Sequence, residues 1–334
     1  MEQFTITFDH ELAEMQEKNR GLIASWQALG NGPRHHYYGR KGNCCLEYRP
    51  WRLFRESRWT TPAAILLNSD EFWMEAHLFR PLFKALVYAE NRFASRFCPL
   101  RSNEERLTGH LISEIGSALA VVTPAIADIA QRAYGIPVEF DFTYSDLSTG
   151  GREKETGADF GVALFVNLPG MREPLIRLAA FQAKKMAKNK AEIDVDQLNA
   201  FDGWSEGKGL YTFYDIDRDR GMAPIVARVK RLKEDDTDQM TGQAANELKG
   251  KGRRRRIDAV EASFCTLSEY LVFDMILNEE GVPADDLRHA AKLMRIGMSK
   301  NSIDDPVKRA LIISIGSTAQ QNIESLHALL QDDQ

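Results

Sequence analysis

The spacing of hydrophobic residues predicts a long helix in the middle of the chain. Residues 102–135 carry apolar residues at helical intervals, and Ser102 and Glu105 open the segment with the S-x-x-E spacing of a capping box. Gly135, followed by Pro137, gives the stop signal. We interpret this segment as one helix, or as two helices broken near Pro124.

Three strands, a second helix and a fourth strand follow. Residues 137–148 alternate apolar and polar residues, as a half-buried strand does, whereas 158–168 and 174–185 are more continuously apolar and predict central strands. Residues 195–204 predict a short helix, and 209–216 predict a fourth strand. The predicted fold is therefore α/β, in the order helix, three strands, helix, strand.

The flanking segments divide the 334 residues into four predicted regions. Residues 1–100 are an N-terminal addition with a helix around 71–97, and 101–227 hold the core just described. Residues 228–256 are rich in charge and poor in large apolar residues, which predicts a mobile excursion. Residues 257–334 have helical periodicity and predict a C-terminal helical region.

Polar residues interrupt the two central strands where only core residues would be expected. Asp159 opens the run of 158–168, and Gln182 and Lys184 close the run of 174–185. Residues two apart on a strand share a face, so Gln182 and Lys184 point the same way. If the two strands are neighbours, the three side chains converge at one end of the sheet, beside small residues that leave room.

An acid from the long helix could join this group. Glu104 falls near the centre of the apolar face, where a carboxylate is costly unless it is paired or metal-bound, whereas Glu105 has the capping-box position. Glu114 and Glu155 are the other acids that could complete a site. Acids in the first turn also stabilise the helix dipole, so the choice among them stays open.

Composition narrows the classes of function. The chain is 43% hydrophobic and 27% charged with a net charge of −5, typical of a soluble globular protein and unlike one that coats nucleic acid through its overall charge. Its four cysteines lack the spacing of a zinc site. The N-terminus lacks signal-peptide features, and we expect a cytoplasmic protein with no membrane segment.

Basic residues gather in two places that could contact phosphate. Residues 34–59 interleave arginine and lysine with tyrosine and tryptophan, which suits phosphate contact and base stacking or, equally, an amphipathic packed surface. The run KKMAKNK at 184–190 begins at the candidate site itself and has the better claim to phosphate contact.

The stretch from GADF to FQAKK resembles the PD-(D/E)xK nuclease superfamily, whose core has the same order of elements. The likeness covers about residues 102–216 and is to the variant with Gln before x-K, as in some type IV restriction enzymes and phage-defence nucleases. It implies a restriction-endonuclease-like core with an N-terminal extension and a C-terminal helical region. By this resemblance Asp159 is the central metal-binding acid, Gln182 the second motif position, Lys184 the lysine and Glu104 the helix acid.

The resemblance implies a metal-dependent endonuclease that hydrolyses DNA phosphodiester bonds in restriction or antiviral defence. Mg²⁺ or Mn²⁺ would be held by Asp159, Glu104, the Gln182 side chain and the Ala183 carbonyl, because oxygen ligands favour hard cations over zinc. Lys184 would orient the attacking water and neutralise developing charge. The implied partners are DNA, a second copy of the chain for cutting both strands, and a protein from the same defence system.

Two other functions fit the same residues. A nucleic-acid-binding module with a degenerate nuclease core is supported by Gln182, which removes a negative charge from the metal site. A partner-controlled subunit of a defence complex would use the N-terminal and C-terminal additions for protein contacts. Metal-dependent loss of substrate would exclude the first, and cleavage only when a partner is added would mark the second.

Overall fold

The structure is a computed structural model that describes residues 78–135, 138–146, 158–168, 171, 173–217, 222–233, 254–277, 279–296, 307 and 309–331. The basic and aromatic segment 34–59, Glu155 and residues 234–253 of the predicted excursion lie outside the described residues. The same is true of the predicted N-terminal addition up to residue 77.

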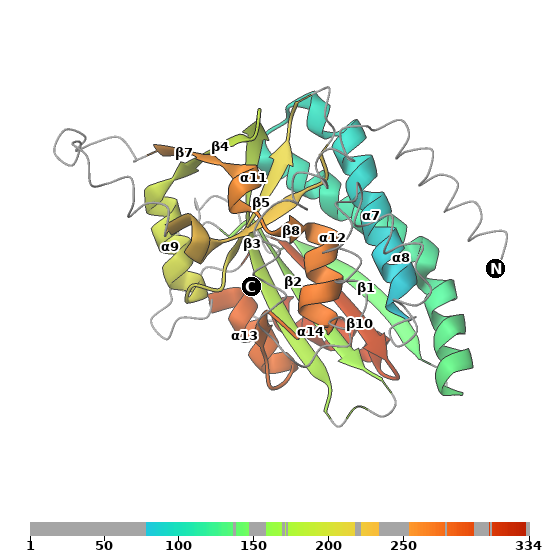
Figure 1. The fold of residues 1–334 in the computed structure, drawn as a ribbon. Coiled ribbons are helices and arrows are strands. Elements are labelled where there is room, and N and C mark those ends of the chain that lie inside the picture. The colour runs from blue at the N-terminus through green and yellow to red at the C-terminus, as the bar shows by residue number, and fades with distance from the viewer. Residues whose placement is uncertain are drawn as a thin grey trace, which may run out of the picture.

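A single mixed β-sheet organises the described part of the chain (Figure 1). Its main path runs in the order β1, β10, β2, β3, β5, β6, β8. The strands of this path are β1 (Glu139–Asp146), β10 (Arg309–Gly316), β2 (Phe160–Asn167), β3 (Leu175–Ala187), β5 (Leu210–Asp215), β6 (Ile225–Arg228) and β8 (Cys265–Thr266). β3 also pairs with β4 (Lys190–Asp194) and β9 (Val282–Pro283), and β4 pairs with β7 (Arg254–Asp258).

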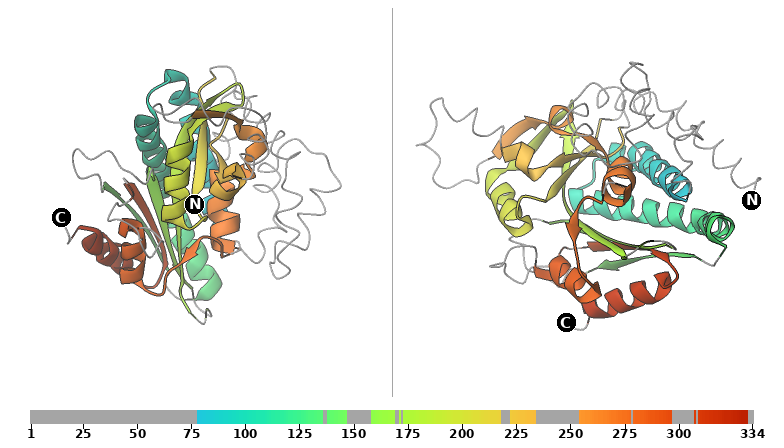
Figure 2. Two further views of the ribbon diagram at one scale, coloured as in Figure 1. Left: turned by 90° about the vertical axis from the view of Figure 1, so that its left-hand side faces the viewer. Right: turned by 60° about the horizontal axis from the view of Figure 1, so that its bottom comes forward.

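Helices cover both faces of this sheet, so the molecule has three layers (Figure 2). One face carries α7 (Phe79–Arg96), α8 (Glu104–Tyr134), α12 (Leu267–Glu269) and the π-helix η3 (Tyr270–Leu277). The other carries α9 (Val195–Ser205), α13 (Leu287–Ile296) and α14 (Ala319–Gln331). The short helices η2 (Cys98–Leu100) and α11 (Ala259–Ala262) complete the described elements.

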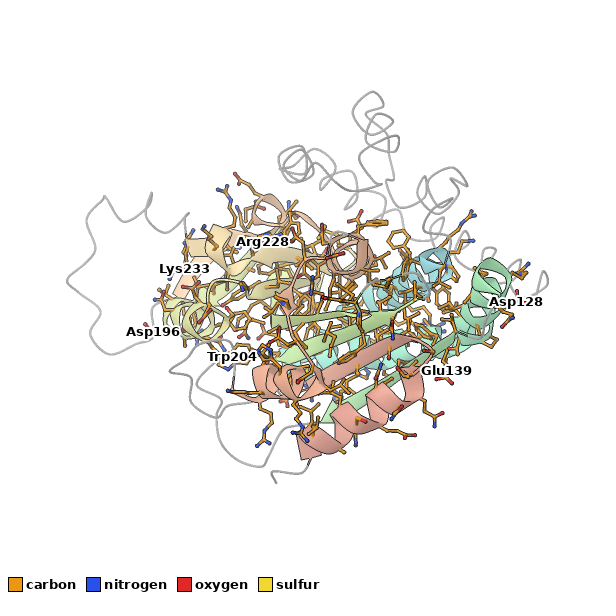
Figure 3. All side chains as sticks on the ribbon, turned by 90° about the horizontal axis from the view of Figure 1, so that it is seen from below. Asp128, Glu139, Asp196, Trp204, Arg228 and Lys233 are labelled. Atoms are coloured by element: carbon orange, nitrogen blue, oxygen red, sulfur yellow. The ribbon has the colours of Figure 1, made fainter. Side chains whose placement is uncertain are left out.

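The central strands are apolar throughout because both of their faces are buried. Along β10, Ile313 belongs to the core cluster on the α8 side and Ile312 to the cluster on the α14 side. Side chains fill the space between the sheet and the helices, and in the view from below Trp204 of α9 lies toward the left end of the sheet and Glu139 of β1 toward the right end (Figure 3). The mixed α/β class predicted from the hydrophobic pattern is confirmed.

The predicted helix over 102–135 forms as one helix, α8, with Pro124 inside it. Its N-cap is Asn103, whose side chain accepts a hydrogen bond from the Arg106 N–H at 2.9 Å, so the predicted capping box from Ser102 to Glu105 is wrong. Asparagine caps a helix as well as serine does and stands one residue closer to the first turn. Gly135, at φ 69°, ends the helix as predicted.

The predicted helical region 257–334 contains β8, β9, β10 and the end of β7 besides its helices, and β10 lies in the middle of the sheet between β1 and β2. β10 runs antiparallel to β1 and parallel to β2. A short apolar run such as ALIISIG reads alike as a buried strand or a buried helix, so periodicity could not separate them. At the end of β10, Gly316 has φ 149°, and a Cβ there would stand 2.4 Å from the Asn167 carbonyl oxygen.

Both ends of the predicted excursion 228–256 are ordered. Residues 229–233 are helical, and Arg254, Arg255 and Arg256 form part of β7 opposite β4. Arg254 pairs with Glu192 of β4 at 3.0 Å, and Arg255 donates to the Leu232 carbonyl oxygen. Composition alone predicted a mobile segment here. It could not show that β4 pairs with the basic run and supplies Glu192 as the partner of Arg254.

The last part of the predicted N-terminal addition belongs to the core. α7 packs along α8, and its buried residues Phe83, Leu86 and Phe93 join the cluster on that face. α8 is the one described helix that is long and apolar enough to cross a membrane, a test that the core helix of a soluble protein also passes. Leu107, Leu111, Leu119 and Ile126 of α8 are fully buried in the same cluster.

Candidate active site

Asp159 stands immediately before β2, at the end of the strand nearest the middle of β3. Its backbone N–H donates to the Phe181 carbonyl oxygen at 2.8 Å, so the pairing of the two strands extends to Asp159. Gln182 therefore lies beside Asp159, and β5 places Tyr211 directly opposite Gln182 on the other side of β3. Asp159, Gln182 and Tyr211 form one row across three strands.

The Asp159 carboxylate is held by donors from β3. Gln182 Nε2 donates to Asp159 Oδ2 at 2.7 Å, and the Ala183 backbone N–H donates to the same oxygen at 2.9 Å. Asp159 and Gln182 are 5% and 2% exposed, so these donors offset much of the cost of burying a carboxylate. Ala183 thus meets Asp159 through its N–H.

Lys184 follows Gln182 on the same face of β3 and lies between two helices. Its Nζ donates to Gln197 Oε1 of α9 at 2.8 Å and stands 3.7 Å from Glu104 Oε2 of α8. The Lys184 side chain is 12% exposed. Its charge is therefore directed into the group of site residues.

Glu104 is the acid of α8 that reaches this group. Its Oε1 accepts the Lys185 backbone N–H at 3.0 Å, which ties the first turn of α8 to β3. Glu105 faces Arg309 of β10 at 3.5 Å, and Glu114 pairs with Arg92 of α7 at 2.9 Å. The structure thus brings Glu104 to Lys184 and to the backbone of β3 two to three residues from Gln182, and it directs the other two acids elsewhere.

Sequence reasoning missed two residues that line the same place, Gln197 and Tyr211. Asp194 caps α9 by accepting the N–H groups of Asp196 and Gln197, which fixes Gln197 in the first turn. The sequence could have placed Gln197 in the first turn of a helix, because Asp194 is a typical N-cap residue. It could not show that Gln197 contacts Lys184, because that contact depends on the path of the chain through β4. Tyr211 gave no signal, because it reads as one aromatic core residue among several in β5.

The environment of Tyr211 is strongly unfavourable to ionisation. Burial raises the pKa of the Tyr211 hydroxyl, and the negative charges of Asp159, Asp194 and Glu104 raise that pKa further. Tyr214 lies on the opposite face of β5, and burial together with the negative charges of Asp159 and Glu104 also raises the pKa of its hydroxyl. Tyr211 therefore stays a neutral phenol that can donate a hydrogen bond near the two carboxylates.

The donor set suits a hard divalent cation. Gln182 Oε1 is buried and has no hydrogen-bond partner among the residues that the structure describes, which is the state expected of an oxygen left for a ligand. The described residues contain no group of three or more His, Cys, Asp or Glu side chains that could hold a metal ion. The available oxygens are thus those of Asp159, Glu104 and Gln182, a set that fits Mg²⁺ or Mn²⁺ better than zinc.

In comparisons with known proteins, no family model, curated protein or solved structure matches the chain.

Proposed function

We propose that this protein is a metal-dependent nuclease that hydrolyses phosphodiester bonds of DNA. The observation that carries the proposal is the convergence of Asp159, Gln182, Lys184 and Glu104, from two strands and one helix, at a single place. An acid and an amide oxygen can hold a metal ion, and a lysine can stabilise negative charge, and phosphodiester hydrolysis can use both functions.

The contacts of these residues suggest a separate role for each of them. Asp159, Glu104, the Gln182 side-chain oxygen and the Ala183 carbonyl would hold Mg²⁺ or Mn²⁺, which when bound lowers the pKa of water and shields charge on phosphate. Asp159 is oriented for this by the Ala183 N–H. Lys184, fixed by Gln197, would place its ammonium beside the reacting phosphate and orient the attacking water.

The biological setting belongs to the proposal as well. A role in restriction or antiviral defence rests on the resemblance to nucleases with Gln before x-K. One such site cuts one strand, so concerted cutting of both strands would require a second copy of the chain. A protein partner from the same system would be a natural source of control.

The test is cleavage of plasmid and linear DNA with Mg²⁺ or Mn²⁺. We expect wild-type protein to cut in a metal-dependent way and Asp159→Ala and Lys184→Ala to lose at least about 100-fold in rate, as the removal of transition-state stabilisation does. Lys292→Ala, on the exposed side of α13, is the matched control and should cut normally. Equal cutting by the site variants would contradict the assignment.

A second candidate, a nucleic-acid-binding module, is favoured by one contact. The Gln182 amide already donates to Asp159 Oδ2 at 2.7 Å, a bond that an acid at this position could not make in its ionised form. The neutral side chain leaves the site one negative charge short of the acidic variant. DNA binding without cleavage under any metal condition would make this function the better one.

A further inference from the structure

Two buried polar atoms that lack hydrogen-bond partners among the described residues belong to paired positions on the adjacent strands β3 and β5. Gln182 Oε1 and the Tyr211 hydroxyl are both inaccessible to solvent and make no hydrogen bond within the described structure. Gln182 and Tyr211 are Cα partners in the parallel pairing of β3 with β5, so their side chains lie on one face. Leaving one acceptor and one donor unpaired side by side is unfavourable unless a ligand satisfies both.

The Tyr211 ring is fixed in place, which makes its hydroxyl a directed donor. Phe201 of α9 contacts the ring edge to face, with centroids 5.9 Å apart, and Phe213 stacks beside it at 6.1 Å. The nearby charges that act on the hydroxyl are those of Asp159, Asp194 and Glu104, all negative. A phenol hydroxyl can donate a hydrogen bond, and this one makes none within the described residues, so an oxygen acceptor is the partner that it lacks.

We infer that Tyr211 is a positioning residue of the cation site, whose hydroxyl donates to a water of the hydrated divalent cation that Gln182 Oε1 and Asp159 hold. This assignment rests on the proposed metal-dependent function and names a residue outside the four that the resemblance supplied. It gives both unpartnered atoms a role, Gln182 as a ligand and Tyr211 as a donor to the coordination shell.

Tyr214 offers an internal comparison for Tyr211. It is on the same strand and is equally buried, but it faces α8, where its hydroxyl lies 3.1 Å from Thr108 Oγ1. Removing the Tyr214 hydroxyl breaks an existing bond, whereas removing the Tyr211 hydroxyl breaks none among the described residues. The two substitutions to phenylalanine should therefore differ in their effect on stability as well as on the cation.

The experiment measures Mn²⁺ binding to the full chain without DNA, by calorimetry, together with Tm in EDTA and in Mn²⁺. We expect Tyr211→Phe to keep or raise Tm in EDTA and to bind Mn²⁺ at least about tenfold more weakly than wild type, as residues around a metal do. Tyr214→Phe should lower Tm in EDTA and keep wild-type Mn²⁺ affinity. Asp159→Ala should abolish binding.

Failure of this inference is distinguishable from failure of the proposed function. Wild-type Mn²⁺ affinity in Tyr211→Phe, with binding still lost in Asp159→Ala, overturns the role of Tyr211 and leaves a nuclease intact. Mn²⁺ binding that weakens in Tyr211→Phe, in a wild-type protein that cuts no DNA, supports the role of Tyr211 and removes the nuclease. Absence of Mn²⁺ binding by wild type overturns the inference directly.

Discussion

At the scale of single residues, Glu104, Glu105 and Glu114 share one helix and meet three different partners. Glu104 contacts β3, Glu105 contacts Arg309 and Glu114 contacts Arg92. We expect Glu104→Ala to weaken Mn²⁺ binding at least about tenfold, because it removes an oxygen from the group that would hold the cation. Titration of Mn²⁺ into the purified variant measures this.

The neighbouring acids provide matched controls for Glu104. Glu105→Ala should bind Mn²⁺ as wild type does, since its side chain is exposed and directed toward β10. Glu114→Ala should lower the free energy of unfolding modestly, by about 1 kcal/mol for a partly buried pair, and leave Mn²⁺ affinity unchanged. Normal binding in Glu104→Ala together with loss in either control would place the helix acid elsewhere.

Gln182 allows a second prediction, in which a charge is added. In Gln182→Glu a carboxylate replaces the amide that now lies 2.7 Å from Asp159 Oδ2, so two buried negative charges face each other. We expect this variant to lose about 1–3 kcal/mol of stability in EDTA and to show a larger rise in Tm with Mn²⁺ than wild type. Gln321→Glu, exposed on α14, should show neither change in thermal unfolding.

At the scale of elements, the junction of α7 with α12 depends on a buried acid. Glu90 of α7 accepts the Ser268 N–H and hydroxyl at 2.6 Å each, while Thr266 and Glu269 form the capping box of α12 beside it. Burial raises the pKa of the Glu90 carboxyl from 4.5 to about 8, against the opposing effect of the Ser268 hydrogen bonds and with a smaller rise from the Glu269 charge. The folded state therefore holds a proton that the unfolded chain releases.

The sign of the pH dependence follows from that raised pKa. The stabilisation is complete below pH 4.5 and is lost as pH rises through about 8, at up to about 1.4 kcal/mol per pH unit in between. Glu90→Gln, which is neutral at every pH, should flatten this slope in urea unfolding measured from pH 5 to 9. Glu324→Gln on exposed α14 should keep the wild-type slope, and an unchanged slope in Glu90→Gln would contradict the assignment.

At the scale of the whole molecule, the sheet is assembled from strands that are far apart in the sequence. β10 separates β1 from β2, and α7 covers α8. We expect residues 101–227 alone to lack cooperative unfolding, because β1 and β2 would each lose their neighbour and the α8 face would lose its cover. A chain ending at residue 306, before β10, should behave in the same way. Native-like circular dichroism and a cooperative transition from either fragment would contradict this.

The sequence by itself determined α8, β1, β2, β3, α9 and β5 but not β4, and it singled out Asp159, Gln182 and Lys184 as candidate site residues. The period of two in β1, the apolar runs of β2 and β3 and the stop signal at Gly135 depend only on neighbours along the chain. Asp159, Gln182 and Lys184 could be selected because a polar residue in an apolar run conflicts with its surroundings. The sequence leaves Glu104 as one of several acids that could join them.

Only the tertiary structure decided what depends on contacts between distant segments. It placed β10 in the centre of the sheet, paired the basic run of β7 with β4, and directed Glu104 toward β3 while Glu105 and Glu114 found partners on β10 and α7. It also brought Gln197 and Tyr211 to the same place from α9 and β5. Periodicity reports which face of an element is buried, but the partner that buries it is fixed by the packing of the whole chain.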